Sequence, residues 1–382
     1  MTKGRVFKRL QVLGILALLV LAGGCQRGSV AQNTIRIAAA APITGPQAET
    51  GQDLINGIRM AVDEKNAGGG VLGKRIELVV FDDVADPKEA VSIAHKICAD
   101  STIMGLVGHM NSGTAKASSP VYAQCGMPVV MPVPTNPSIT KQGFTNLFRV
   151  PPTDLDQGTD IAKYAITKMG KKRFAIIHDS TAYGQPLAEV VRKTVGEAGA
   201  QVVTFDGINE GDKDFRALLT RIRGTNPDVL FFGGMYNEAG LLAKQAKEVG
   251  IKVTFLAPDG SFAQKFIDLA GAANAEGAVM SFIAPDEKTN DATRAFSLKF
   301  RQRYGSIKAF APLGYDAANI LMAGLANAGK ADKASVISAL HSVDFEYSGV
   351  TGKSKFQADG DNTRRSVYFF IVRGGKYEPL VN

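Results

Sequence analysis

The sequence contains no tryptophan, four histidines and three cysteines among its 382 residues. The absence of indole rings counts mildly against a sugar-binding site. Neither the GxSxG motif of serine hydrolases nor the HExxH motif of zinc peptidases occurs, and the histidines lack metal-ligand spacing. We therefore expect no metal, no cofactor and no enzymatic activity. The histidines are His95, His109, His178 and His341, and we expect His109 and His178 to line a cleft without a catalytic role.

Two stretches imitate functional motifs but lack a required feature. Residues 68–75 nearly match the P-loop GxxxxGK[ST], yet Arg75 replaces the hydroxyl residue that binds Mg²⁺. This stretch also follows a predicted helix and precedes a predicted strand, the reverse of the P-loop order, which favours a helix-ending turn. The acidic run Asp82–Asp86 lacks calcium-loop spacing. We interpret it as a polar loop between a strand and a helix.

The first 25 residues have the pattern of an export signal. Four basic residues precede the apolar run Val12–Val20, which is too short to span a bilayer permanently. Residues 21–25 (LAGGC) are similar to a bacterial lipobox, although leucine lies one position further from Cys25 than in the commonest pattern. Two interpretations stay open, lipidation of Cys25, which we favour, and an ordinary signal peptide. Gln26, which directly follows the cysteine, favours the outer membrane as the destination of a lipidated protein. We thus expect a periplasmic protein whose contact with the membrane is limited to a lipid on Cys25.

Charge of one sign is not concentrated in the mature chain. Removing the four basic residues of the export signal lowers the formal net charge from +8 to +4. The basic runs Lys171–Arg173 and Arg364–Arg365 are short and have no aromatic residues interleaved. This pattern is typical of a solvated surface. We expect no nucleic-acid partner.

The two remaining cysteines, Cys98 and Cys125, each fall late in a predicted helix. In an oxidising compartment they could pair, which a chain-entropy model values at roughly 3–4 kcal/mol. Two buried thiols are an equally open alternative. Neither residue belongs to a CxxC or Cys/His metal pattern.

From Thr34 onward, predicted strands and helices alternate with the rhythm of a parallel sheet. The first series has strands at 34–41, 75–81, 102–107 and 128–131, and helices at 51–66, 86–99 and 112–123. The second has strands at 174–177, 202–205, 229–232, 254–256 and 279–282, and helices at 186–198, 215–223, 239–249 and 262–269. Helices at 292–304 and 312–328 and a strand at 367–372 follow. This order predicts an α/β fold of two doubly wound lobes.

Two segments have the features of crossings between these lobes. Phe148–Thr153 contains a double proline that removes backbone donors and fixes φ, which suits a stiff connection. Ser281–Pro285 is the expected return. A cleft between the lobes follows from this arrangement.

Small polar residues follow two successive strands of the first series. The strand at 102–107 leads into Asn111, Ser112 and a helix, and the strand at 128–131 leads into a loop containing Thr135. Helix N-termini carry unpaired N–H groups and a positive dipole end, and ligands of parallel sheets bind at the carboxyl ends of strands. The pattern predicts a site for a small molecule that bears a negative group.

Many short motifs, in order along the mature chain, resemble those of the periplasmic branched-chain amino-acid-binding proteins of ABC importers (the leucine/isoleucine/valine-binding type). They are Gly45-Pro46, Gly51, Asn56-Gly57, Asn66–Gly69, Asp82-Asp83, Asp86-Pro87, Val107–His109, Ser112-Gly113, Pro132, Thr135–Pro137, Phe148-Arg149, Ala182–Gly184, Asn226–Asp228 and Phe232–Gly234. The resemblance implies a type I periplasmic binding protein fold with three crossings, the third near Asn362–Ser366. The ligand would bind in the interlobe cleft. The implied lobes comprise residues 33–150 with 284–363, and 151–283 with 364–382.

The resemblance also implies how a ligand is held. Ser112, its neighbours Met110 and Asn111, and Thr135 would receive a carboxylate, whereas Asp259 would take an ammonium group. Tyr183 would press on the ligand from the second lobe. Ser112 and Thr135 could instead be capping residues, and Asp259 a turn residue. The apolar wall of the site would comprise Thr50, Val133, Met235, Tyr236 and Phe310. Some relatives have aromatic rings in place of Thr50 and Met235.

The resemblance implies a non-enzymatic receptor, a monomer that closes around an amino acid and delivers it to an inner-membrane permease. Leucine, isoleucine or valine is the leading ligand. An amide, a urea-like compound or an aromatic acid is the alternative, since the wall positions depart from those of relatives. A ligand sensor without a transport role is a further alternative, and a nucleotide-binding enzyme is distant.

Overall fold

The computed structural model describes residues 33–380. The predicted export signal and the lipidation of Cys25 lie outside these residues and stay predictions. Within the described part, none of the helices combines the length and the hydrophobicity that crossing a membrane requires.

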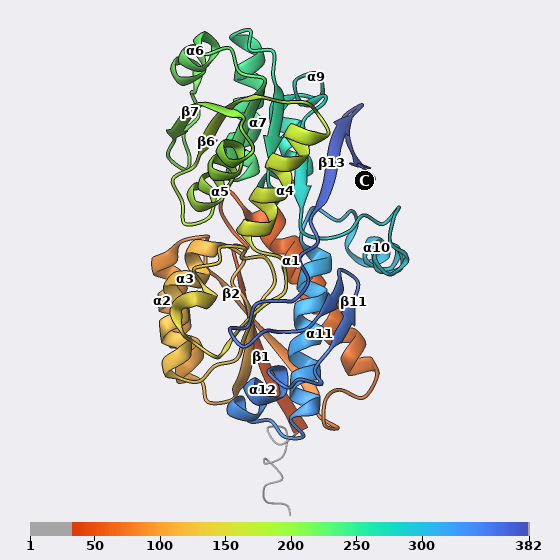
Figure 1. Cartoon of the computed structure of the whole chain (residues 1–382). Coiled ribbons are helices and arrows are strands. Elements are labelled where there is room, and N and C mark those ends of the chain that lie inside the picture. The colour runs from red at the N-terminus through yellow and green to blue at the C-terminus, as the bar shows by residue number, and fades with distance from the viewer. Residues whose placement is uncertain (1–32, 381–382) are drawn as a thin grey trace, which may run out of the picture. The chain divides into compact units, whose positions relative to one another are not determined.

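The first sheet is parallel where its register is defined and has the order β2-β1-β3-β4-β5 (Figure 1). Its strands are β1 (Thr34–Ala41), β2 (Arg75–Asp82), β3 (Ile103–Gly108), β4 (Val129–Met131) and β5 (Leu147–Arg149). Its helices are α1 (Ala48–Ala67), α2 (Pro87–Ala99), α3 (Ser112–Gln124), α11 (Ala311–Asn327) and α12 (Lys333–Leu340).

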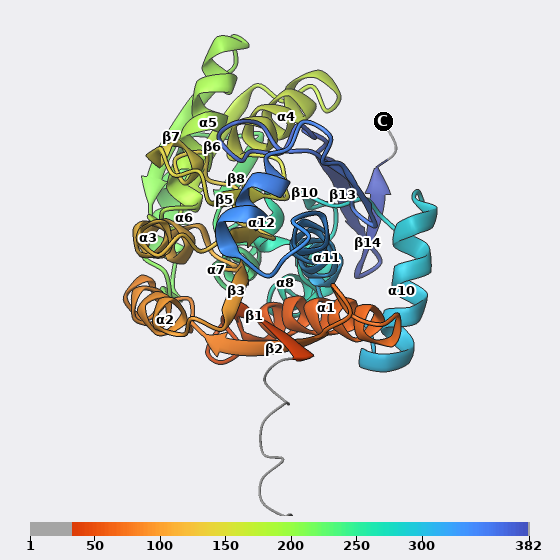
Figure 2. The ribbon, with the colours of Figure 1, turned by 90° about the horizontal axis from the view of Figure 1, so that it is seen from below.

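Alternation of side chains along β1 divides the core of this first lobe into two layers. Ile37 and Ala39 pack with α1 and α11, whereas Ala38 and Ala40 pack with α2 and α3. Figure 2 shows these two pairs of helices on opposite faces of the sheet. Because both faces are covered, β1 is apolar at successive positions instead of alternating with polar residues.

The second sheet has the order β14-β13-β10-β9-β8-β6-β7. Its strands are β6 (Arg173–His178), β7 (Gln201–Gly207), β8 (Val229–Gly233), β9 (Thr254–Ala257), β10 (Val279–Phe282), β13 (Tyr368–Arg373) and β14 (Lys376–Leu380). The edge hairpin β13–β14 is antiparallel, and β13 pairs antiparallel with β10. The helices of this second lobe are α4 (Asp154–Thr167), α5 (Gly184–Glu197), α6 (Arg216–Gly224), α7 (Tyr236–Glu248), α8 (Gln264–Ala270) and α9 (Ala272–Ala275).

Helices again cover both faces of this sheet. Ile176 and Phe231 pack with α4 and α5, and Ile177 and Phe232 pack with α6, α7 and α8. The remaining elements are the 3₁₀ turns η2 (Thr140–Gln142) and η3 (Asp259–Ser261), helix α10 (Asp291–Tyr304), and strands β11 (Tyr347–Gly349) and β12 (Gly352–Ser354). The α/β fold class with two doubly wound sheets is thereby confirmed.

Three segments connect the two sheets, at 150–153, 283–290 and 355–367. The third segment ties the other two together, because Arg364 donates to the carbonyl oxygens of Val150 (3.2 Å) and Ile283 (3.5 Å). Asn362 donates to the same Val150 oxygen at 2.7 Å. The three crossings therefore lie side by side. The lobe boundaries given above stay a prediction, since residues 35–382 cluster as a single unit.

Several elements were not predicted from the sequence, and of these α4 matters most for the site. Its N-terminus has a capping box, in which Thr153 and Asp156 satisfy each other's backbone donors. Helix α4 therefore begins directly after the double proline that the sequence analysis interpreted as a crossing alone. Strands β11, β12 and β14 and helix α12 were also not predicted.

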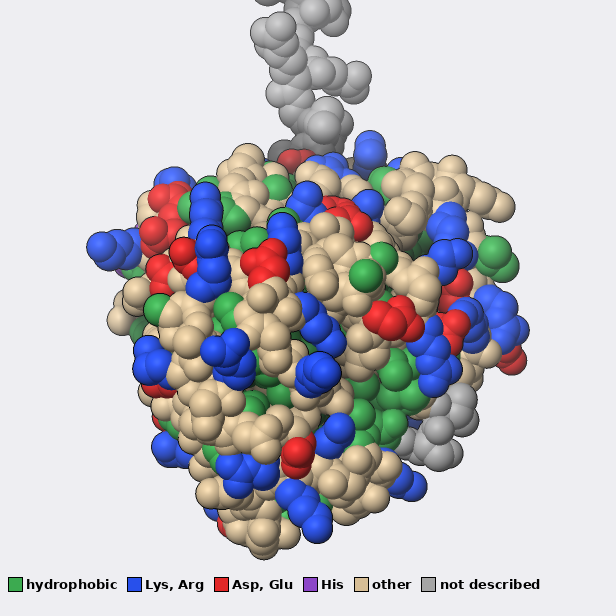
Figure 3. Space-filling view, turned by 90° about the horizontal axis from the view of Figure 1, so that it is seen from above, with side chains coloured by type: hydrophobic (Ala, Val, Ile, Leu, Met, Phe, Trp, Pro, Cys, Tyr) green, Lys and Arg blue, Asp and Glu red, His purple; other side chains and the backbone are tan. Residues whose placement is uncertain are grey.

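Charges of both signs are interspersed on the face of the molecule shown in Figure 3. In the second lobe, Arg221 lies 3.4 Å from Asp206 and Arg216 lies 3.0 Å from Asp214. Such exposed pairs contribute little to stability.

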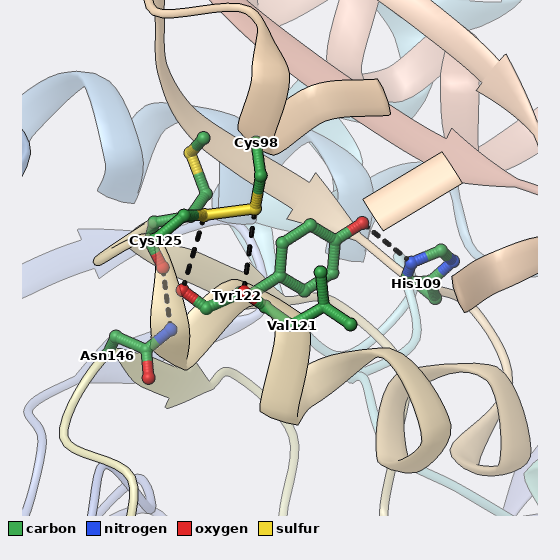
Figure 4. Close-up of a disulfide and its surroundings, with 7 residues drawn as sticks. Cys98, His109, Val121, Tyr122, Cys125 and Asn146 are labelled. Atoms are coloured by element: carbon green, nitrogen blue, oxygen red, sulfur yellow. Dashed lines mark hydrogen bonds between the residues drawn. A yellow bond between two sulfur atoms is a disulfide. The ribbon is translucent and has the colours of Figure 1, made fainter. Parts of the chain in front are cut away.

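In the structure Cys98 and Cys125 form a disulfide that joins α2 to the end of α3 (Figure 4). The bond closes a loop with a sequence separation of 27. Both cysteines pack against a buried apolar cluster that includes Ile97, Tyr122 and Met127. The disulfide thus braces the outer helix pair of the first lobe.

We predict that the Cys98→Ser/Cys125→Ser double variant unfolds at a lower denaturant concentration, because it loses roughly 3–4 kcal/mol of cross-link stabilisation. Urea unfolding with and without reductant measures this difference. Ligand affinity should stay within about twofold, since neither cysteine lines the pocket described below. Two titratable thiols in the denatured, unreduced mature protein, beyond any at Cys25, would show that the pair is not joined.

Candidate functional site

A pocket lies between the carboxyl ends of the two sheets and contains about 300 Å³ of space. Its lining residues come from the loops after β3, β4, β8 and β9 and from the starts of α5 and α11. They are Met110, Asn111, Ser112, Val133, Pro134, Thr135, Tyr183, Met235, Asp259, Gly260 and Phe310. Nine of the eleven residues predicted to bind ligand are therefore brought together.

The other two predicted residues, Thr50 and Tyr236, do not line this pocket. Thr50 is buried in α1 and its hydroxyl donates to the Gln47 carbonyl oxygen at 3.1 Å. The Tyr236 hydroxyl donates to the Pro46 carbonyl oxygen at 2.9 Å. Both side chains support the turn at 45–47 instead of facing the pocket.

One end of the pocket is built from hydrogen-bond donors of the first lobe. Ser112 is the first residue of α3, and Asn111 precedes it as the N-cap residue. The Ser112 hydroxyl accepts from the Asn136 backbone N–H at 3.4 Å, whereas the Thr135 hydroxyl has no hydrogen-bond partner of good geometry among the described residues. A helix N-terminus with free hydroxyls suits a carboxylate.

The second lobe contributes a carboxyl group to the pocket. Asp259 follows β9 as the first residue of η3 and is 2% exposed. The Tyr183 hydroxyl donates to Asp259 Oδ1 at 2.8 Å and accepts from the Gly260 N–H at 3.0 Å. Burial raises the pKa of Asp259 to about 6. The two lobes thus offer groups of opposite character to one ligand.

Helix α4 places two further polar residues behind the pocket, Asp154 and Gln157, each 0% exposed. Both carboxylate oxygens of Asp154 and both polar atoms of the Gln157 amide lack a hydrogen bond of good geometry in the described chain. Burial, reinforced by the negative charge of Asp259, raises the pKa of Asp154 to about 7. The capping box at Thr153 was the signal in the sequence that could have placed them.

Side chains of the two lobes meet around the pocket. Asn111 donates to Gln47 Oε1 at 2.7 Å, and Gln47 in turn donates to Glu210 Oε1 of the second lobe at 3.2 Å. On another side, the Asn136 amide donates to the Ala182 carbonyl oxygen. These bonds, with that of Tyr236 to Pro46, hold the cleft in a closed arrangement.

The remaining walls are apolar. Met110 and Val133 of the first lobe face the pocket with Met235 of the second lobe and Phe310. The Phe310 ring stacks on Phe282 with 6.0 Å between centroids. Unbranched methionine side chains adapt to differently shaped apolar groups.

The two histidines expected near the cleft do not line it. His109 is buried, and its ring nitrogens lie 2.6 Å from Asp83 Oδ2 and 3.1 Å from the Tyr122 hydroxyl (Figure 4). His178 packs against Phe205. Asp83 is therefore the hydrogen-bond partner of a buried histidine. In the described chain, no group of three or more His, Cys, Asp or Glu side chains could hold a metal ion.

A family model described as "Periplasmic binding protein" matches residues 34–376. The chain belongs to this family. The leucine-, isoleucine-, valine-, threonine- and alanine-binding protein of Pseudomonas aeruginosa is 35% identical over 350 residues, covering 91% of this chain and 92% of the relative. A Leu/Ile/Val-binding protein homolog of Brucella abortus is 34% identical and covers 84% of this chain and 85% of its own length.

Solved structures of the same type superpose closely. A leucine-binding protein from Thermotoga maritima has a TM-score of 0.85 at 28% identity, covering 91% of this chain and 98% of that one. A branched-chain amino-acid transporter substrate-binding protein from Streptococcus pneumoniae, in complex with isoleucine, has a TM-score of 0.83 at 28% identity and covers 90% and 98%. The resemblance found in the sequence is confirmed over most of the chain.

The raised pKa of Asp154 makes stability of the ligand-free protein depend on pH. A carboxyl group whose pKa is higher in the folded than in the unfolded protein stabilises the fold when protonated, and this contribution is lost as pH rises through its folded pKa of about 7. We predict that Asp154→Asn has a higher melting temperature than the native protein at pH 8 but not at pH 5. Calorimetry of the ligand-free proteins measures this, with the exposed Asp344→Asn as control. If the melting temperatures of the native protein and of Asp154→Asn change with pH in the same way, the prediction is wrong.

Proposed function

We propose that the protein is a periplasmic receptor that captures an α-amino acid with an apolar side chain, with leucine, isoleucine and valine as the leading ligands, and delivers it to the permease of an ABC importer. The observation that carries this proposal is the polarity of the pocket. Hydrogen-bond donors of the first lobe and buried carboxyl groups of the second lobe meet at the pocket, and its remaining walls are apolar.

The donor end suits the ligand carboxylate. Ser112 and the N-terminus of α3 supply donors, and the Thr135 hydroxyl, which also lines the pocket, supplies another. No lysine, arginine or histidine of the described chain lines the pocket. A single carboxylate can be held by such neutral donors, whereas a dicarboxylate would lack a cation for its second charge.

The carboxyl end suits the ligand ammonium group. Asp259 lines the pocket, and Asp154 lies close enough for the negative charge of Asp259 to raise its pKa. An ammonium group has three donors and can satisfy more than one of these buried acceptors. An aromatic acid or other ligand without an amine would leave both carboxyl groups without a cationic partner, which disfavours the alternative ligands that the sequence left open.

The apolar walls select the side chain. Burying a group of the size of a leucine side chain contributes roughly 1.5–3 kcal/mol. Met110, Val133, Met235 and Phe310 provide this contact, and the relatives from Pseudomonas aeruginosa and Brucella abortus are named for binding such amino acids. Family membership also supports export to the periplasm and an ABC permease as partner.

We predict that leucine binds with about micromolar or tighter affinity and that Asp259→Asn weakens it by roughly 3–5 kcal/mol, a hundredfold or more. The substitution preserves size but removes the charge that pairs with the ammonium group. Calorimetric titration of the refolded, ligand-stripped mature protein with leucine, valine, phenylalanine, glutamate and isovaleramide measures both effects.

The exposed Asp268→Asn on α8 is the matched control and should bind as the native protein does. If isovaleramide or a plain carboxylic acid binds more tightly than leucine and Asp259→Asn changes little, the amino-acid assignment is wrong while the fold remains.

We also predict that leucine affinity falls as pH is lowered. Asp259 must be ionised to pair with ammonium, so affinity should decrease about tenfold per pH unit below its pKa of about 6. Leucine itself keeps both charges between pH 8 and pH 5. Titrations across this range measure the profile, which should flatten in Asp259→Asn. A flat profile in the native protein would show that Asp259 does not hold the ammonium group.

A further inference from the structure

The loop that carries Thr135 has its backbone held by three donors in succession. Arg149 donates to the carbonyl oxygens of Pro134 (Nη1, 2.6 Å) and Asn136 (Nη2, 2.9 Å). The backbone N–H of Asp154 donates to the Thr135 carbonyl oxygen at 2.9 Å. Every carbonyl of residues 134–136 is therefore fixed on the side of the loop that faces Arg149 and α4.

Fixing these carbonyl groups also fixes the direction of the neighbouring N–H groups. In a planar trans peptide the N–H points opposite to the preceding C=O, and the peptide bonds of this loop are trans. The bond from Arg149 to Pro134 thus turns the Thr135 N–H away from the guanidinium. The Asn136 N–H points to the Ser112 hydroxyl in the same manner. Thr135 lines the pocket, and Asn136 holds the Ser112 hydroxyl, which also lines it.

Arg149 is itself held in one orientation. It is 0% exposed, and its Nε lies 2.8 Å from Asp361 Oδ1. The Thr140 hydroxyl accepts from Nη2 at 3.1 Å and donates to the same Asp361 oxygen at 2.9 Å. The Arg149 backbone N–H donates to Gly360. The planar fork of the guanidinium can make these bonds simultaneously, which a lysine ammonium group cannot do.

We propose that Arg149 is a positioning residue for the carboxylate end of the pocket, and that Asp361 in the third crossing anchors it. Arg149 does not line the pocket, so it acts through the loop at 134–136. The inference rests on the proposed function in one respect, namely that the ligand bears a carboxylate at this end. Its role is to orient the Thr135 N–H, and to keep the Asn136 N–H on Ser112, before the ligand arrives, which avoids the cost of ordering these groups on binding.

The test compares leucine with leucinamide, which keeps the ammonium group and side chain but lacks the carboxylate. In Arg149→Lys, which retains the positive charge, we expect the dissociation constant for leucine to rise about 10- to 100-fold and that for leucinamide to change less than about threefold. Asp361→Asn should show the same pattern with a smaller loss. Competition titrations give both constants.

The matched control is Arg365→Lys, which alters an exposed ion pair to Asp156 (3.1 Å) near the same crossing and should bind both ligands as the native protein does. Hydrogen exchange of the segment 132–137 provides a readout that needs no ligand. It should accelerate in Arg149→Lys and Asp361→Asn, while exchange elsewhere is unchanged. If Arg149→Lys fails to fold, Asp361→Asn carries the test.

The outcomes separate the two proposals. If the native protein binds no amino acid, the proposed function is wrong, and exchange in the segment 132–137 still decides whether Arg149 orders the loop. If the native protein prefers leucine but the variants weaken both ligands equally, or neither, the positioning role is overturned and the proposed function stands.

Discussion

The site contains two buried carboxyl groups that form no salt bridge in the described chain. These groups constrain the charge of any ligand that binds beside them. Asp154 is fully buried and Asp259 nearly so, and this burial raises their pKa values to about 7 and about 6, with the negative charge of Asp259 adding to the effect at Asp154. An isolated buried charge is costly. In the empty pocket these groups can be protonated, whereas a ligand ammonium group would favour their ionised forms. The ammonium group of a ligand would therefore supply the positive charge that these two carboxyl groups lack in the described chain.

The donor end depends on a different kind of constraint, because its N–H groups need direction more than charge. Arg149 supplies that direction through the carbonyl groups of Pro134 and Asn136. Its anchor, Asp361, belongs to the crossing in which Asn362 and Arg364 bind the other two crossings. The third crossing thus connects the other two crossings, through Arg149, with the loop at 134–136. A change in the hinge could alter loop geometry without any new contact to the ligand.

The sequence allowed the fold and the first contacts of the site to be predicted because both depend on local patterns. Alternating strands and helices indicated parallel sheets, and Ser112 and Thr135 directly follow strand ends. Asp154 and Gln157 were missed because the double proline suggested a crossing and obscured the helix that begins after it. Arg149 could not be assigned a role, since its contacts with Pro134 and with Asp361, 212 positions away, exist only in the folded chain.

Thr50 and Tyr236 show the limit of transferring positions from relatives. Neither side chain lines the pocket, because the Thr50 hydroxyl bonds to Gln47 and the Tyr236 hydroxyl to Pro46 of the same turn. These residues help to close the lobes and do not shape the wall. The wall instead contains Met110 and Met235, whose flexible side chains impose little shape on a ligand. In the proposed receptor, rigid groups hold the head group of the amino acid and flexible methionine side chains contact its side chain, so closely related apolar amino acids should differ less in affinity than ligands with an altered head group.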